Sequence, residues 1–364
     1  MKRNRVPRAA AAMSALLAAC TTPPFVQGSD GTQSPNIELV RLDPDVYAAV
    51  RREPLGLAVN ANSLLIVRDS DVVVADAQFT RAATRETIAA LRTITDKPVR
   101  YVINTHWHDD HVAGNQVYRD SFPGVRFVMH ANTAADLVAL GAPNRTGTVE
   151  GAPPLADRYE RLLGMGLGID STITSPAESA SVTSAIRIIR AYIAENPDFR
   201  AIPADDTVRS RLTLRVGRDR IDVWWFGPGN TRGDLVVHLP DKGIVATGDL
   251  VVAPIPFAFG SNPGAWVGAL DSISALRPRI LLPGHGPVMR DLGYLQTVRD
   301  ALERIRDQTA QAVARGDSLD AALGAVTLDD LRLALTGDEK WLNYMFRNFF
   351  VRPAVRAAFT PTPP

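Results

Sequence analysis

Three histidines and two aspartates stand close together in the chain, at His106, His108, Asp109, Asp110 and His111. The chain has six histidines in all, so half of them lie in this hexapeptide. At the end of an extended strand, side chains two residues apart leave on the same face. Imidazole nitrogens and a carboxylate are ligands that a divalent transition metal, zinc above all, prefers. The segment therefore predicts a metal site, against the alternative of a solvated polar loop.

The pattern His106-x-His108-x-Asp110-His111 resembles the signature of the metallo-β-lactamase superfamily, including its glyoxalase II-like and lactonase-like hydrolases. Later segments resemble further elements of that family, namely Gly229–Asp234, Thr247–Asp249 and Pro283–Gly286. Each match is weak alone, but together they are strong because they come in the family's order. The resemblance covers roughly residues 56–288. It implies an α/β fold, an αββα sandwich with a dinuclear metal site at one edge.

The resemblance also implies which residues hold metal. One position would be complete, with Asp110, His111, Asp249 and His285 as ligands, and Asp249 would bridge to the other position. His106 and His108 would serve that other position, where the family pattern Gly-His-Thr-x-Gly-Asp supplies a third histidine. The cofactor implied is zinc, as one or two ions, with manganese or iron as alternatives.

Asn230 stands where the third histidine is expected. An amide oxygen is a weaker ligand for zinc than imidazole, so metal affinity should fall or metal preference should change. Asn230 could also hold a water molecule by a hydrogen bond instead of binding metal. We favour an adapted site over an inactive one because the flanking pattern is intact, and the asparagine variant is similar to a known branch of the superfamily.

The chemistry implied by the resemblance is metal-assisted hydrolysis of an amide, lactone or ester by metal-bound hydroxide. Asp110 would accept or orient the proton, in addition to binding metal. The sequence contains no Gly-x-Ser-x-Gly elbow, which argues against a covalent serine route. Two alternatives stay open: a non-catalytic periplasmic accessory lipoprotein that binds metal or ligand, and an iron-dependent oxygenase on the same fold.

Buried strands must deliver these loops. Val72–Ala75 is a continuous β-branched run, typical of a strand buried on both faces, and Val99–Ile103 leads into the histidines. Asp76 ends the first run; the resemblance implies that it supports the metal loop, and the alternative is an exposed loop residue. Apolar spacing predicts a helix over Thr84–Thr95. Further strands are expected at Ile37–Val40, Val46–Val50, Leu57–Asn60, Ser63–Arg68, Val125–Met129, Arg211–Val216 and Arg220–Phe226.

Two regions lie outside the family pattern. Within residues 134–200, helices are expected at Leu155–Leu163 and Ala177–Glu195, the second with apolar residues at helical spacing. This helical insertion either packs passively on the sandwich or forms a lid or dimer surface. Residues 291–364 are predicted as a helical C-terminal extension, which leaves 37–290 as the metallo-β-lactamase-like domain.

Several other side chains are candidates for the substrate pocket. Residues 252–262 form a loop rich in proline, phenylalanine and glycine that follows a predicted ligand. Phe257, Phe259 and Trp266 could line the pocket or pack in the core. His130 follows a buried strand, and we expect it to have a structural role.

The N-terminus has the pattern of a secretion signal. Residues 1–8 are basic, 9–19 are small and apolar, and Leu17-Ala18-Ala19-Cys20 resembles a bacterial lipobox. Residues 1–19 are therefore predicted to be a signal peptide and 20–36 a flexible tether rich in proline, glycine and serine. Cys20 is the only cysteine, and its place favours a lipid anchor over a buried core residue. We expect a periplasmic protein attached at the outer membrane.

Composition narrows the partners. The chain has 40 basic and 39 acidic residues, and the first 19 residues carry four basic and no acidic ones. The remainder has 40 − 4 = 36 basic residues against 39 acidic, a net charge of −3. Nucleic-acid binding would need a basic face, so none is expected. We expect a small-molecule substrate, and membrane contact only through a lipid on Cys20; the sequence leaves the oligomeric state open.

Overall fold

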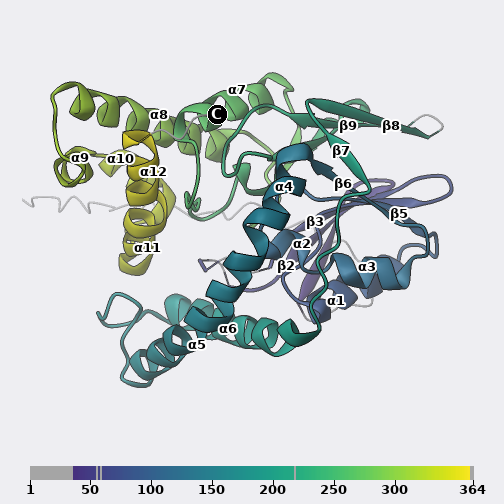
Figure 1. Cartoon of the computed structure of the whole chain (residues 1–364), viewed down its shortest axis with the longest axis horizontal. Helices are drawn as coiled ribbons and strands as arrows, with labels where there is room; N and C mark the ends of the chain where they lie inside the picture. Colours follow the sequence, from purple (N-terminus) through teal and green to yellow (C-terminus); the bar gives the residue numbers. More distant parts are fainter. Residues whose placement is uncertain (1–35, 55, 58–59, 217–218, 361–364) are drawn as a thin grey trace, which may run out of the picture.

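Two β-sheets face each other in the computed structural model, which describes residues 36–54, 56–57, 60–216 and 219–360 (Figure 1). The larger sheet has the order β1-β2-β3-β4-β5-β6-β7, antiparallel from β1 to β4 and parallel from β4 to β7. Its strands are Ile37–Asp43, Val46–Arg51, Ser63–Val67, Val72–Ala75, Val99–Ile103, Arg126–His130 and Asp206–Val208.

The smaller sheet has the order β12-β11-β10-β9-β8. Only its β11–β12 pair is parallel. Its strands, taken along the chain, are Arg211–Val216, Asp219–Trp225, Leu235–Leu239, Ile244–Ala246 and Ile280–Leu282. Strands β8 and β9 correspond to the strands predicted at Arg211–Val216 and Arg220–Phe226, and they pair as an antiparallel hairpin.

Apolar side chains fill three layers. One cluster lies between the sheets, where residues such as Val73 and Ile103 meet Val223 and Val237. The outer face of the larger sheet packs against α1 (Arg81–Arg92) and α3 (Asn115–Ser121). The outer face of the smaller sheet packs against α7 (Pro263–Ala275) and α8 (Gly293–Ala314). This arrangement is an αββα sandwich, so the predicted fold class is confirmed.

Element boundaries differ from the predictions where local chemistry intervenes. Helix α1 begins at Arg81, three residues before the predicted start, because the Thr80 side chain accepts a hydrogen bond from the Ala83 amide and caps the helix. The strand predicted at Leu57–Asn60 is wrong at Leu57 and Asn60, which lie outside any strand; residues 58–59 are outside the described ranges. The predicted signal peptide (1–19), and the tether (20–36) apart from Asn36, are also outside them.

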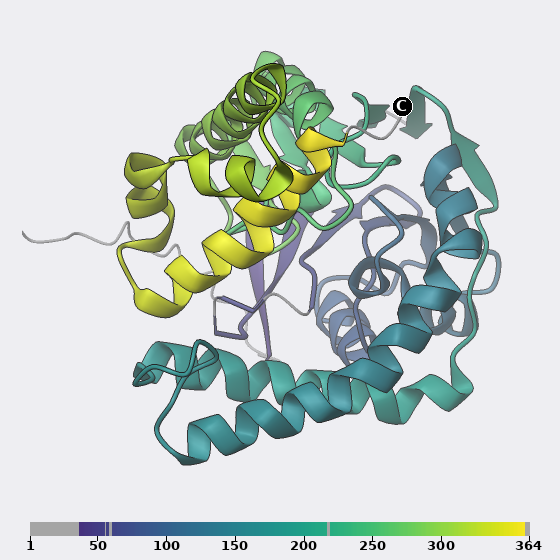
Figure 2. The same cartoon turned by 60° about the vertical axis from the view of Figure 1, so that its left-hand side comes forward.

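The insertion consists of three helices that run along one side of the sandwich (Figure 2). They are α4 (Ala131–Ala139), α5 (Gly141–Gly164) and α6 (Pro176–Glu195), followed by a short 3₁₀ turn, η1 (Asn196–Asp198). Helix α6 starts within one residue of its predicted position. Helix α5 begins far before the predicted Leu155, and continues through Pro153 and Pro154. Packing against α4 and α6 outweighs the low helix propensity of those residues.

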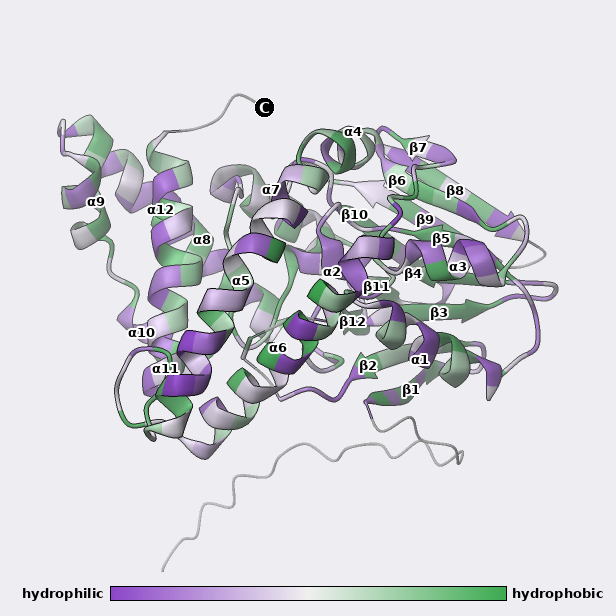
Figure 3. Cartoon of the chain, turned by 60° about the horizontal axis from the view of Figure 1, so that its bottom comes forward, coloured by the Kyte–Doolittle hydropathy of each residue, from purple (hydrophilic) through white to green (hydrophobic). Residues whose placement is uncertain are grey.

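The region predicted as the C-terminal extension, residues 291–364, is helical over its described part, but its first helix, α8, packs on the smaller sheet as a layer of the sandwich. We keep the name C-terminal extension for the elements after α8, which are α9 (Leu319–Ala325), α10 (Asp329–Thr336), α11 (Lys340–Met345), the π-helical segment η4 (Phe346–Val351) and α12 (Arg352–Phe359). Trp341 and Phe350 join the apolar cluster beneath α7 and α8. Apolar and polar residues alternate along these helices, as Figure 3 shows. Among the described residues, no helix combines the length and apolar character that crossing a membrane requires.

Candidate metal centre

The predicted ligands meet at one edge of the sandwich, on loops that follow buried strands. His106 and His108 lie between β5 and α2 (Asp109–Val112), and Asp110 and His111 lie on α2 itself. The remaining ligands come from the smaller sheet: Asn230 from the β9–β10 loop, Asp249 from the turn η3 (Gly248–Leu250) and His285 from the loop after β12. Three loops, the short helix α2 and the turn η3 therefore converge.

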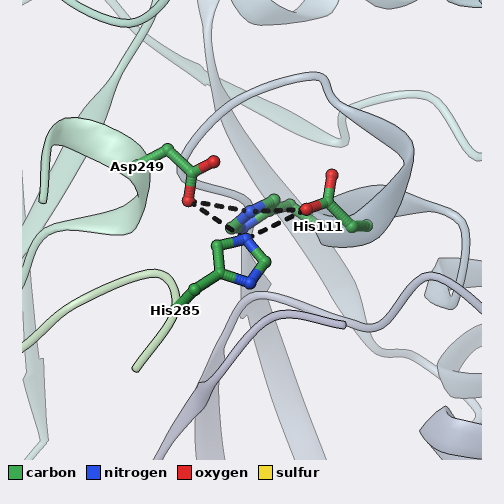
Figure 4. A group of neighbouring side chains, drawn as sticks. His111, Asp249 and His285 are labelled. Carbon is green, nitrogen blue, oxygen red and sulfur yellow. Dashed lines mark ion pairs between the residues drawn. The ribbon is translucent and has the colours of Figure 1, made fainter. Parts of the chain in front are cut away.

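The first group of side chains comprises Asp110, His111, Asp249 and His285, whose ligand atoms all lie within 4.8 Å of one another. His285 Nε2 is 3.0 Å from Asp110 Oδ2 and 3.4 Å from Asp249 Oδ1. His111 Nε2 is 3.2 Å from Asp249 Oδ1 and 3.5 Å from Asp110 Oδ2. Figure 4 shows His111, Asp249 and His285 pointing toward one another. This group could hold a metal ion, and we call it the four-ligand half.

The second group comprises His106, His108 and the same Asp249. His106 Nε2 is 3.0 Å from His108 Nδ1 and 3.8 Å from Asp249 Oδ2. Asp249 thus presents one carboxylate oxygen to each group. Asn230 lines the cavity that opens onto these ligands, and its buried amide nitrogen has no hydrogen-bond partner among the described residues. We call His106, His108 and Asn230, with the shared Asp249, the asparagine half.

Contacts with oxygen atoms at Nδ1, two hydrogen bonds and one ion pair, fix how three histidines face the centre. The Thr105 hydroxyl donates its proton to Asp76, so it can only accept from His106 Nδ1, 3.1 Å away. His285 Nδ1 lies 2.9 Å from the Asn60 carbonyl oxygen, which can only accept. His111 Nδ1 lies 2.9 Å from Asp76 Oδ2. Each Nδ1 therefore faces an oxygen, and each Nε2 is turned toward the centre, where a metal would replace any proton that Nε2 carries.

Asp76 supports both groups from beneath. Its carboxylate accepts hydrogen bonds from the Thr105 amide (2.7 Å) and hydroxyl (2.8 Å), in addition to its contact with His111. The residue is buried and adopts φ 62°, a left-handed conformation that aspartate tolerates better than most residues. The alternative of an exposed loop residue is wrong, and Asp76 occupies the supporting position that the family resemblance implied.

The pKa values of the histidines in the two halves are shifted in opposite directions. Burial lowers the pKa of His106 and His108. Burial also disfavours charge on His111, but Asp76, Asp249 and Asp110 raise its pKa well above the usual value. Burial would raise the pKa of Asp110 and Asp249, yet charges from histidines, chiefly His111, hold both carboxyl pKa values below their usual range.

The buried carboxylates therefore need positive charge beside them. Without metal, protons on His111 and His285 provide it, since the pKa of His285 is also raised against burial by Asp249 and Asp110. A divalent cation can replace those protons, because it binds deprotonated imidazole and carboxylate together. Nitrogen and carboxylate donors on several loops fit zinc, with manganese and iron also compatible.

Hydrogen bonds and close packing hold the loop that carries Asn230 in place. Asp234 accepts hydrogen bonds from the Thr231 amide (2.7 Å) and hydroxyl (3.0 Å), and burial raises the pKa of Asp234 to about 7. A side chain at Gly229 would come within 2.3 Å of Leu250, so the chain passes too close for any larger residue. The loop therefore keeps the architecture expected of the family although its histidine is missing.

Sequence reasoning missed a cluster around Asp109, which the insertion holds in place. Arg145 of α5 donates a 2.6 Å hydrogen bond to Asp109 Oδ1, and the Tyr192 hydroxyl of α6 donates to Asp109 Oδ2. The Arg145 guanidinium also lies 3.3 Å over the Phe199 ring. No local signal could reveal these contacts, because the partners are 36 and 83 residues from Asp109.

A cavity of about 200 Å³ opens onto the centre. Its lining includes three phenylalanines together with five of the predicted ligands, namely Phe79, Phe257, Phe259, His108, Asp110, Asn230, Asp249 and His285. Of the two roles that the sequence left open for Phe257 and Phe259, the structure shows both residues in the cavity lining.

Two other predicted positions lie away from the cavity. Trp266 packs in the core, the second of the two roles that the sequence left open for it: it is fully buried, and its indole donates to the Leu250 carbonyl. The structural role of His130 is confirmed, since it caps α4 and stacks on Trp225.

Comparison with known proteins agrees with this geometry. The description "Metallo-beta-lactamase superfamily" belongs to a family model that matches residues 56–314. A linear primary-alkylsulfatase from Pseudomonas sp. (strain ATCC 19151) is 23% identical over 285 residues, which cover 72% of this chain. The match covers 49% of the alkylsulfatase, so this chain spans about half the length of that relative.

Solved structures share the fold. A metallo-beta-lactamase from Pontibacter korlensis superposes with a TM-score of 0.51 at 19% sequence identity, covering 73% of this chain and 99% of that one. A metallo beta lactamase from Erythrobacter litoralis also gives a TM-score of 0.51, at 15% identity, covering 75% and 99%. The uncovered quarter of this chain is consistent with additional helices around a common sandwich.

Proposed function

The chain belongs to the metallo-beta-lactamase superfamily, and from this premise we propose that it is a metal-dependent hydrolase of an amide, lactone or ester. One observation carries the proposal. The Nδ1 atoms of His106, His111 and His285 each face an oxygen, so their Nε2 atoms are turned toward the half-buried carboxylates of Asp110 and Asp249. Histidines arranged in this way are prepared to bind a metal and serve little purpose in a purely structural core.

We assign the ligands by the geometry of the two halves. Asp110, His111, Asp249 and His285 would hold one ion, and Asp249 would reach the other half through its second oxygen. In the asparagine half, His106 and His108 would bind with Asn230 as a neutral third partner. A divalent ion in this centre would act as a Lewis acid and lower the pKa of a water molecule.

Asp110 has the position to move the proton. Its side chain reaches the cavity while Oδ2 is held 3.0 Å from His285, and its pKa lies well below the usual range despite burial. The carboxylate is therefore ionised at neutral pH and can orient a water molecule or accept its proton. Among the described residues that line the cavity, there is no serine, cysteine or lysine that could act as a covalent nucleophile.

The fold alone does not identify the substrate. A β-lactamase-like substrate, a lactone or another ester fits periplasmic placement, which we propose together with a lipid anchor on Cys20. The alkylsulfatase relative adds sulfate esters to the candidates. The second candidate function, a non-catalytic accessory lipoprotein that binds metal or ligand, is favoured by one observation alone, the replacement of a histidine by Asn230.

Metal content and turnover test the proposal together. The protein lacking residues 1–20 is purified, and its zinc, manganese and iron are quantified per chain. It is then assayed against a β-lactam, a lactone, an aryl ester, an amide and an alkyl sulfate, with each metal supplied in turn. We expect at least one tightly bound ion and hydrolysis that a chelator abolishes. Less than one ion per chain with no turnover would support the accessory protein, whereas oxygen consumption with iron alone would support the oxygenase.

A further inference from the structure

Aromatic rings from two separate loops line the cavity together with the candidate ligands. Phe79 comes from the loop between β4 and α1, and Phe257 and Phe259 come from the loop that follows Asp249. Phe259 is 53% exposed, which is unusual for so large an apolar side chain and places it at the entrance. The cavity therefore offers apolar surface directly beside the groups proposed to bind metal.

The insertion backs the first wall. Tyr192 of α6 stacks on Phe79 with ring centroids 4.1 Å apart and an angle of 3° between the planes. The Tyr192 hydroxyl donates to Asp109, which lies between His108 and Asp110 in the metal loop. Because one side chain contacts both Phe79 and Asp109, the orientation of the aromatic wall is tied to that of the metal loop.

The C-terminal extension backs the opposite wall. Phe349 of η4 packs against Phe257 and Phe259, with ring centroids 5.6 Å and 5.7 Å apart. The Ala258 amide, between the two phenylalanines, donates a 2.9 Å hydrogen bond to the Phe349 carbonyl. Each wall is thus held by a helical region that lies outside the sandwich, and both helical regions contribute to one cavity.

The charges of the lining distinguish possible substrates. In the part of the chain that the structure describes, no lysine or arginine lines the cavity, and the ionisable groups of the lining are the candidate ligands themselves. An anionic group distant from the metal would therefore meet aromatic rings and find no cationic partner, which is costly. An apolar group there would bury its surface against the three rings.

We propose that Phe79, Phe257 and Phe259 form a subsite for an uncharged, apolar acyl or aryl group on the substrate, with Tyr192 and Phe349 as positioning residues. This inference rests on the proposed hydrolase function and narrows its substrate class. The preferred substrates would be neutral esters or lactones with a hydrophobic side chain, in place of substrates with a second negative charge.

Binding of alkyl hydroxamates tests the subsite without requiring turnover. Acetohydroxamate and hexanohydroxamate share one metal-binding group and differ only in the length of the apolar tail. We expect the zinc-loaded protein to bind the hexanoyl compound at least about tenfold more tightly, since a single methylene in an apolar pocket is worth about tenfold or more. Equal affinities, measured by calorimetry, would overturn the subsite whether or not any ester is hydrolysed.

Turnover of matched 4-nitrophenyl esters tests the charge preference. The hexanoate ester should exceed the acetate ester in kcat/KM by about tenfold or more, and the hemisuccinate ester, which carries a carboxylate on its acyl chain, should fall below both. A hemisuccinate preference would overturn the inference. If no ester is hydrolysed with any metal, the hydrolase proposal fails, and the hydroxamate result still decides the subsite.

Substitution of the phenylalanines tests whether their rings cause the preference for the longer apolar tail. Phe257→Ala and Phe259→Ala should each remove most of the preference for the longer tail while the affinity for acetohydroxamate and the metal content stay unchanged. Met165→Ala is the matched control, because Met165 is an exposed apolar residue outside the cavity, and it should retain the full preference. A preference that survives both phenylalanine substitutions would place the subsite elsewhere.

Tyr192 separates stacking from hydrogen bonding. Tyr192→Phe keeps the ring against Phe79 and should keep the tail preference, whereas Tyr192→Leu should lower it. Circular dichroism and metal content show whether each variant is folded. If the folded Tyr192→Leu protein discriminates as well as the parent, Tyr192 has no positioning role.

Discussion

Both halves of the candidate metal centre take ligands from the segment His106–His111, but they differ in the number and charge of their ligands. Asp110, His111, Asp249 and His285 give the four-ligand half two imidazoles and two carboxylates at mutual distances of 3.0–3.5 Å. The asparagine half has two imidazoles, a more distant contact of 3.8 Å to Asp249, and a neutral amide. Because carboxylates supply most of the attraction for a dication, the four-ligand half should bind metal more tightly.

The difference also extends to the charges of the histidines. In the four-ligand half, carboxylates raise the pKa values of His111 and His285, while in the asparagine half burial lowers those of His106 and His108. Metal entering the four-ligand half must displace protons, whereas the asparagine half is already deprotonated but weakly charged. Sequence motifs that look equivalent can therefore have opposite electrostatic character.

Removal of single ligands should have the largest effect on metal binding by the two halves. Asp249→Ala should abolish tight binding in both halves, since one carboxylate serves both, and His285→Ala should abolish it in the four-ligand half alone. Each loss should exceed the roughly 10- to 100-fold that removal of a ligand's hydrogen-bond partner costs. Metal per chain after dialysis against a chelator measures this.

His106→Ala is the matched control for the ligand variants. It should leave the tight ion in place, because His106 belongs to the asparagine half only. Unchanged metal stoichiometry in Asp249→Ala and His285→Ala would refute the ligand assignment, and equal losses in His106→Ala and His285→Ala would remove the proposed difference between the halves.

Asp76→Asn should weaken both halves to a smaller and similar extent. Asparagine keeps the size and tolerates φ 62°, but it removes the negative charge that contacts His111 and the Thr105 group behind His106. We expect metal affinity to fall about 10- to 100-fold. Competition titration with a coloured chelator provides the measurement, and a loss confined to one half would show that Asp76 supports only that half.

Asn230→His should produce the smallest change in metal affinity, and it should make the affinities of the two halves more similar. Imidazole is a better zinc ligand than an amide, so the weaker ion should bind roughly tenfold more tightly, the low end of effects seen around metal ligands. Calorimetric titration of the metal-free protein with zinc follows both binding steps. Asn230→Ala is the control, and a weaker second ion in the histidine variant would show that asparagine is the better partner here.

The local pattern predicted much of the fold and the ligand set. Continuous β-branched runs such as Val72–Ala75 became buried strands, and His106 to His111 followed directly from the strand before them. Short motifs at Asp249 and His285 were found because each follows an apolar strand, which is a local signal. For Trp266 the sequence left a pocket and a core position open, because an aromatic residue in a loop-to-helix segment suits both, and the structure places it in the core.

The sequence by itself determined the kinds of atoms available for chemistry and the strands that end beside them. Tertiary structure alone decided which atoms face one another: the split of Asp249 between two groups, the Nδ1 partners that orient the histidines, and the backing of Phe79 by Tyr192, which lies on a distant helix. The reason is physical. Periodicity and propensity act over a few residues, whereas packing joins side chains more than a hundred positions apart.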